Sequence, residues 1–99
     1  MKSISILGIF VADLSFFGKI PNKGETVIGK KFVVGPGGNG SNQSVAVSKS
    51  GGRANFISKI GKDDYGRMAE QIYKETNVGT KNLIVSKKHN TGVAANLLN

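Results

Sequence analysis

The sequence predicts an α/β protein with a doubly wound parallel sheet and a second, smaller sheet beside it. Two observations carry this expectation: apolar runs alternate with helical patterns after residue 36, and extended segments at 14–34 and 91–98 interrupt the alternation. Strands that alternate with helices form parallel sheets, because each helix returns the chain across a face of the sheet. The extended segments break that rhythm, so we expect them to form the small sheet.

The first third of the chain is expected to be extended. Ser5–Val11 is almost wholly apolar, as in a buried strand of a parallel sheet, and Asp13 follows at its carboxyl end. A second extended piece over 14–20 ends at a turn rich in proline, asparagine and glycine. A third strand is expected over 26–34, with Gly29 as a bulge.

Helices enter after the glycine-rich segment. We expect, in order, a helix over 42–50, a strand over 54–60, a helix carrying residues 65–73 and a strand over 83–85. Ser41 is the expected N-cap of the first helix, and Asp63 or Asp64 that of the second. The second helix has apolar residues at i, i+3, i+4, i+7 and i+8, namely Tyr65, Met68, Ala69, Ile72 and Tyr73.

Composition excludes several classes of protein. Cysteine is absent, which excludes disulfides and thiolate metal sites, and no apolar run reaches membrane-spanning length. The first residues do not form a signal segment, so we expect a cytoplasmic protein without a membrane partner. The net charge is +8, but the basic residues are spread along the chain without a block of five. We therefore expect no nucleic-acid partner. His89 stands alone in a turn and is expected at the surface.

The chain stops inside an apolar extended run after only three predicted parallel strands. Such a sheet would leave an open apolar edge and uncovered faces. We therefore expect the chain to be the amino-terminal third of a larger protein.

The segment over 35–43, G-P-G-G-N-G-S-N-Q, is the strongest candidate for a binding site. Glycine lets a ligand approach the backbone, and free N–H groups at the start of the following helix point outward. Asn39, Ser41 and Asn42 carry side chains that can hydrogen-bond hydroxyl groups. The pattern favours a site for a small, oxygen-rich molecule, with a glycine-rich turn that binds nothing as the plain alternative.

The same segment matches the dinucleotide fingerprint G-x-G-x-x-G literally. That fingerprint needs the loop after the first strand and an acidic residue at the end of the next, where Lys59-Ile60-Gly61 stands instead. A P-loop would need a lysine where Ser41 stands. A dinucleotide-binding βαβ domain is therefore kept only as a third alternative.

A set of motifs runs through the whole chain in order. It comprises Ile6-Leu7-Gly8 with Asp13, the P-x-x-G-E-T turn at 21–26, the glycine segment at 37–46, the G-x-D-x-x-G segment at 61–66 and Thr91-Gly92-Val93-Ala94. Together they resemble the ribokinase-like (PfkB) family of carbohydrate kinases. The resemblance implies that residues 1–12 and 36–90 begin the α/β core domain. It implies that residues 13–35 and 91–99 supply strands of a β lid over the sugar.

The resemblance also implies a set of substrate-binding residues: Asp13, Gly38, Asn39, Asn42, Ala94 and Asn96. Asp13 would accept hydrogen bonds from sugar hydroxyls, Gly38 would let the ring lie against the backbone, and Asn42 would bind a ring hydroxyl. Ala94 and Asn96 would form a wall of the site.

Two positions depart from ribokinases proper. Asn39 stands where they often carry a lysine, and Val11 where they carry a sugar-binding asparagine. The identity of the sugar, or of a nucleoside, therefore stays open. Phe16 and Phe17 lie in the expected lid, where contact with a second subunit and a wall over the sugar are both possible roles.

For the whole protein the resemblance implies transfer of the γ-phosphate of ATP to a sugar hydroxyl, with Mg²⁺ and a monovalent cation such as K⁺. The family's catalytic base and ATP pocket belong to a D-T-x-G-A-G-D segment, which these 99 residues lack. We therefore expect no catalytic, cofactor-binding or metal residue in this chain, which alone would be inactive. The alternative is a non-catalytic sugar-binding or regulatory module.

Overall fold

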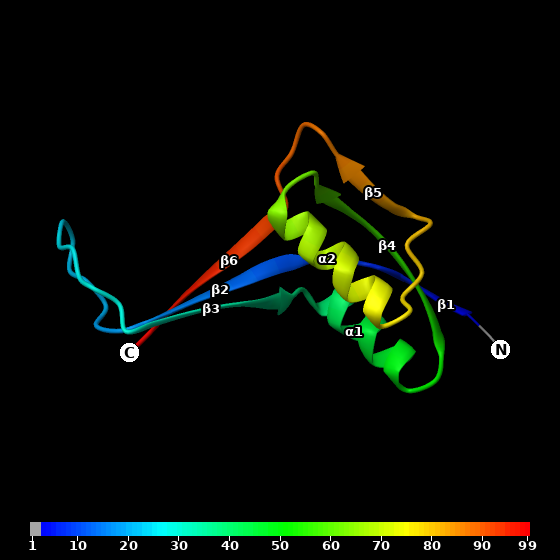
Figure 1. Cartoon of the computed structure of the whole chain (residues 1–99), viewed down its shortest axis with the longest axis horizontal. Helices are drawn as coiled ribbons and strands as arrows, with labels where there is room; N and C mark the ends of the chain where they lie inside the picture. Colours follow the sequence, from blue (N-terminus) through cyan, green and yellow to red (C-terminus); the bar gives the residue numbers. More distant parts are fainter. Residues whose placement is uncertain (1–2) are drawn as a thin grey trace.

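The computed structural model describes residues 3–99 and contains six strands and two helices (Figure 1). In chain order they are β1 (Ser3–Leu7), β2 (Val11–Phe17), β3 (Lys31–Gly37), α1 (Asn39–Lys49), β4 (Arg53–Gly61), α2 (Asp64–Glu75), β5 (Leu83–Ser86) and β6 (Gly92–Leu98). The order of strands and helices is the one predicted from the sequence.

The strands form two separate sheets. The first has the order β1-β4-β5 and is parallel throughout, and the second has the order β3-β2-β6. In the second sheet β2 runs antiparallel to β3 and parallel to β6. Figure 1 shows this sheet projecting from the helices as an arm, with residues 18–30 at its far end. A parallel α/β sheet with a small sheet beside it is thus confirmed.

A compact aromatic cluster holds the helices on the parallel sheet. The ring of Tyr73 in α2 lies 5.3 Å from that of Phe56 in β4 and 6.4 Å from that of Phe10, centroid to centroid. The Tyr73 hydroxyl hydrogen-bonds Ser41 of α1 at 2.6 Å, and both residues are buried. Burial raises the pKa of Tyr73 above its usual value, and the hydrogen bond with Ser41 offsets only part of this rise. Ser41 therefore joins the two helices.

The predicted strand over 5–11 is wrong in one respect, because residues 8–10 interrupt it and separate β1 from β2. A Cβ at Gly8 would lie 2.8 Å from the Cα of Gly40, so the backbones of this break and of α1 touch. Phe10 turns into the core, and the chain passes from the parallel sheet to the arm. Asp13 is consequently the third residue of β2 rather than the residue after the first strand.

The boundaries around the glycine segment also differ from the prediction. Strand β3 starts at Lys31 and not at residue 26, so the predicted bulge at Gly29 is wrong, because Gly29 lies outside the strand. The strand also takes in Gly35–Gly37, which were expected in the loop. Because β3 is an edge strand, Pro36 can stand in it without a ladder hydrogen bond of its own. The N-cap of α1 is Gly38, with φ 96°, and not Ser41. The predicted Asp63 cap of α2 is confirmed, since its side chain accepts a hydrogen bond from the Gly66 N–H.

Within the described residues, neither α1 nor α2 has the length and hydropathy that a helix needs to cross a membrane.

Candidate functional site

One face of the arm brings together three of the residues predicted for the site. In the strand register, Asp13 of β2 stands opposite Ala94 of β6, and Ser15 stands opposite Asn96. Side chains alternate along a strand, and paired residues point to the same side of the sheet. Asp13, Ser15, Ala94 and Asn96 therefore share one face, which we call the polar face.

The Asp13 carboxylate lies directly against the backbone of Gly37. A Cβ placed on Gly37 would lie 2.6 Å from Oδ2 and 2.8 Å from Oδ1 of Asp13. Only glycine leaves room for the carboxylate in this position, because a larger residue would displace it. Gly37 ends β3 and immediately precedes the N-cap of α1, so the carboxylate lies close to the start of this helix.

The start of α1 presents polar groups without a capping side chain. Its N-cap is Gly38, no side chain caps the helix, and the first turn has no acidic residue. The first N–H groups of a helix have no intrahelical acceptors and carry partial positive charge. Asn39 and Asn42 are both exposed in this turn, three positions apart and hence on one side of the helix.

The six predicted residues thus fall into two groups that meet at Gly37. One lies on the polar face of the arm, and the other at the start of α1. The chemistry available is a carboxylate acceptor, amide side chains that donate and accept, and backbone donors. This set suits hydrogen bonding to hydroxyl groups. Among residues 3–99 there is no cluster of three or more His, Cys, Asp or Glu side chains that could hold a metal ion.

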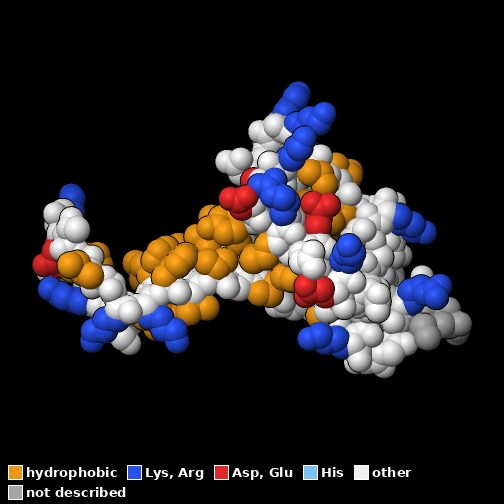
Figure 2. Space-filling view, viewed as in Figure 1, with side chains coloured by type: hydrophobic (Ala, Val, Ile, Leu, Met, Phe, Trp, Pro, Cys, Tyr) orange, Lys and Arg blue, Asp and Glu red, His pale blue; other side chains and the backbone are white. Residues whose placement is uncertain are grey.

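The opposite face of the arm is apolar in every strand. Alternation places on it the residues Ala12, Leu14, Phe16, Phe32, Val34, Pro36, Val93, Ala95 and Leu97. Several of them are open to solvent: Phe32 is 53% exposed and Leu97 56%. The rings of Phe16 and Phe32 stack with centroids 4.9 Å apart. Figure 2 shows hydrophobic side chains gathered along the arm. We call this surface the apolar face. Phe16 lies on it, whereas Phe17 lies on the polar face.

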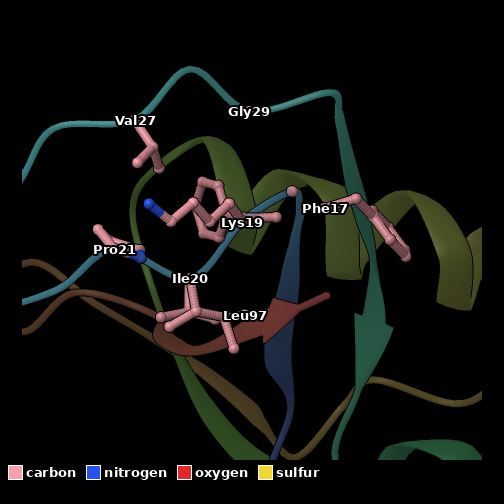
Figure 3. Close-up of a pocket in the computed structure, with 9 residues that line it drawn as sticks. Phe17, Lys19, Ile20, Pro21, Val27, Gly29 and Leu97 are labelled. Atoms are coloured by element: carbon pink, nitrogen blue, oxygen red, sulfur yellow. The ribbon is translucent and has the colours of Figure 1, made fainter.

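A hollow of about 200 Å³ at the tip of the arm was not predicted from the sequence. Its walls come from residues 16–21, Val27, Gly29 and Leu97 (Figure 3). Residues 19–30 are outside any strand, so their apolar side chains have no periodic pattern to reveal them. The available signal was Ile20 beside the turn at 21–24, together with Val27 and Ile28, which the sequence assigned to the strand expected over 26–34.

The whole chain, residues 1–99, matches the family described as pfkB family carbohydrate kinase. The ribokinase of Lactococcus lactis subsp. lactis (strain IL1403) is 39% identical over 87 residues, which cover 81% of this chain and 29% of that protein. The ribokinase of Mus musculus is 30% identical over 98 residues, covering 98% of this chain and 30% of that protein. The chain therefore spans less than a third of the length of these relatives.

Solved structures agree. Ribokinase from Cryptococcus neoformans var. grubii serotype A, in complex with ADP, superposes with a TM-score of 0.85 at 29% identity, over 96% of this chain and 30% of that one. Ribokinase from Giardia lamblia gives a TM-score of 0.86 at 30% identity, over 96% of this chain and 31% of that one. The resemblance inferred from the motifs is confirmed: this chain belongs to the pfkB family of carbohydrate kinases.

Proposed function

We propose that this chain forms the sugar-binding part of a kinase that transfers the γ-phosphate of ATP to a hydroxyl of a sugar or nucleoside in the cytoplasm. The observation that carries the proposal is the Asp13 carboxylate, seated on Gly37 where the polar face meets the start of α1. An ionised carboxylate is a strong acceptor for hydroxyl groups. A polyol lying here would have acceptor and donor groups on two sides.

Each remaining residue has a role that follows from its position. Gly38, the N-cap of α1, offers its backbone at the start of the helix, and Asn39 and Asn42 offer amide groups from the first helical turn. Ala94 and Asn96 form a wall beside Asp13, because they lie on the neighbouring strand. The arm would act as a lid, since its closure carries Asp13 and this wall over the sugar. Closure would exclude water, which protects the phosphoryl donor from hydrolysis.

We infer that the phosphoryl-transfer half of the site lies outside these 99 residues. ATP supplies the phosphoryl group, and Mg²⁺ and K⁺ are expected to act with it. The sequence lacks the D-T-x-G-A-G-D segment, to which the family's catalytic base and ATP pocket belong. The carboxylate, amide and backbone N–H groups present here suit hydrogen bonding to hydroxyl groups. This chain therefore binds the sugar, orients it and excludes water.

A ligand screen on the full-length protein tests the proposal. We expect one sugar or nucleoside to raise the melting temperature with increasing concentration, because a ligand that binds only the folded state stabilises it. The same compound should cause ADP release from ATP. If no sugar or nucleoside stabilises the protein, the proposal fails. Binding without ADP release would favour the non-catalytic module, and stabilisation by NAD or FAD would favour a dinucleotide-binding domain.

We further propose that the apolar face is covered by a second copy of the protein. Monomeric proteins rarely expose a contiguous apolar surface of this kind, and such surfaces mark interfaces. The polar face lies on the other side of the same sheet, so a dimer formed in this way leaves the sugar site free. Phe16 would then lie in the dimer interface, and Phe17 would lie on the face that is turned toward the sugar.

Replacing Phe32 by lysine is expected to break this dimer. The charge would enter the apolar face beside Phe16, whose ring stacks on that of Phe32. Loss of an anchoring aromatic residue typically costs about 2 kcal/mol or more, roughly a 30-fold weaker dissociation constant. Light scattering after gel filtration measures the mass. The matched control is Ile28→Lys, which changes a 94% exposed residue outside the apolar face and should stay dimeric. A monomeric wild type, or a dimeric Phe32→Lys, would contradict the proposal.

A further inference from the structure

A group of hydrogen bonds joins the end of β4, the start of α2 and the residue before β6. The Asp63 carboxylate accepts from the Gly66 N–H at Oδ1 (2.8 Å), from the Thr91 N–H at Oδ2 (2.8 Å) and from the Thr91 hydroxyl at Oδ1 (2.6 Å). The Gly61 N–H in turn donates to Thr91 Oγ1 at 2.9 Å. We call Gly61, Asp63, Gly66 and Thr91 the root cluster.

The residues of the root cluster pack so closely that neither of its two glycines has room for a side chain. A Cβ on Gly61 would lie 2.5 Å from the Thr91 nitrogen and 2.6 Å from Asp63 Oδ2, and one on Gly66 would overlap the Gly61 carbonyl oxygen. Thr91 is only 6% exposed. The three donated hydrogen bonds, that of the Thr91 hydroxyl first, hold the pKa of the Asp63 carboxyl below its usual value, so the group is ionised at neutral pH.

Capping of α2 explains only part of this arrangement. An N-cap needs one oxygen atom to accept from the first turn of the helix, and Oδ1 does this through the Gly66 N–H. The second oxygen, Oδ2, is directed to the Thr91 backbone instead. Asp63 therefore connects the parallel sheet and α2 to the residue from which β6 departs, and Figure 1 shows β6 starting beside this end of α2.

The position of Thr91 decides which residues of β6 stand beside the sugar site. The strand begins at the next residue, where Gly92 pairs with Val11, and two positions later Ala94 pairs with Asp13. A slip of one residue would turn Ala94 and Asn96 to the apolar face, because strand side chains alternate. The preceding residues 87–90 are exposed, so the root cluster is the buried connection between β6 and the core at this end.

We propose that Asp63 is a positioning residue for the sugar site: its carboxylate anchors Thr91 to the core and so holds Ala94 and Asn96 beside Asp13. This inference rests on the proposed function for its effect on catalysis. Its structural part, the anchoring of β6, does not depend on any ligand.

The test is Asp63→Ser in the full-length protein. Serine keeps an oxygen that can cap α2, but it lacks the second oxygen that accepts from the Thr91 N–H. We expect the KM for the sugar to rise roughly 5-fold or more while the KM for ATP stays within about 2-fold. Amide hydrogen exchange should become faster over residues 91–96 and stay unchanged over 67–73 in α2. The matched control is Asp64→Ser, because the Asp64 side chain is 94% exposed and pairs with Arg67 at the surface.

Variants of Thr91 provide an independent arm if Asp63→Ser does not fold. Thr91→Ser keeps the hydroxyl and should behave like the wild type, whereas Thr91→Val loses it and should reproduce the faster exchange of residues 91–96. The double variant Asp63→Ser/Thr91→Val should lose less than the sum of the two single variants, because each of them removes the hydrogen bond between the Thr91 hydroxyl and the Asp63 carboxylate.

Two results would overturn the inference. One is unchanged hydrogen exchange over 91–96 in Asp63→Ser or Thr91→Val. The other is faster exchange in α2 alone, which would reduce Asp63 to a helix cap. A protein that binds no sugar would instead refute the proposed function, and hydrogen exchange would still decide whether Asp63 anchors β6.

Discussion

Replacing Asp13 by asparagine is expected to weaken sugar binding about 100-fold in the full-length protein. Hydrogen bonds to a charged acceptor contribute about 1.5–3 kcal/mol each, roughly twice as much as neutral ones. The amide removes the charge and turns one acceptor into a donor, and a loss of about 2.7 kcal/mol corresponds to a factor of about 100. The shapes of the two side chains are nearly the same, so asparagine should still fit against Gly37.

Calorimetric titration of the sugar found in the ligand screen measures this effect. The melting temperature without ligand should change by only a few degrees, because the Asp13 carboxylate faces the proposed ligand rather than the core cluster. Asp64→Asn is the matched control, since it makes the same change at an exposed position of α2. Binding by Asp13→Asn within threefold of the wild type would show that Asp13 is not the main sugar acceptor.

Local signals predicted much of the fold. The order of the strands and helices follows from periodicity alone, since apolar runs and helical spacing alternate along the chain. The N-cap at Asp63 was also predicted from a local pattern, because an aspartate followed by helical apolar spacing marks a helix start. These features depend on neighbours within a few residues, which a sequence displays directly.

The errors fall where distant segments touch. The interruption at residues 8–10 coincides with the approach of Gly8 to Gly40. Ser41 is not the N-cap because α1 already begins at Asn39, and its hydroxyl hydrogen-bonds Tyr73, 32 positions away. The contact between Ser41 and Tyr73 leaves no trace in the local pattern. Only Gly8 inside an otherwise apolar run indicated that the first strand could be interrupted.

The candidate site was predicted as a set of residues but not as a geometry. The motifs supplied Asp13, Ala94 and Asn96, yet their common face follows from the parallel pairing of β2 with β6, at opposite ends of the chain. The sequence predicted that a sugar ring approaches Gly38, but it gave no sign that the Asp13 carboxylate lies against Gly37. Gly38 also provides the turn between β3 and α1, and that conformational role has a testable consequence.

Replacing Gly38 by alanine is expected to lower the free energy of unfolding by about 3 kcal/mol or more. A residue with a Cβ pays roughly 1–2 kcal/mol to adopt a left-handed backbone, and Gly38 has φ 96°. The added Cβ would also overlap the Ile9 carbonyl oxygen and lie 3.1 Å from the Cα of Phe10. Overpacking of this kind typically adds about 1–3 kcal/mol, because neighbouring backbone must move.

The control that isolates the contact is Gly51→Ala. Gly51 has a similar φ of 91°, but nothing lies within 4 Å of the position that its Cβ would take. This variant should therefore lose only about 1–2 kcal/mol, the cost of the backbone conformation alone. Urea unfolding of the wild type and both variants measures the difference. Equal losses in the two variants would mean that the junction between β3 and α1 accommodates a methyl group without strain. The close packing of Gly38 against Ile9 would then not determine where α1 begins, nor the positions of Asn39 and Asn42.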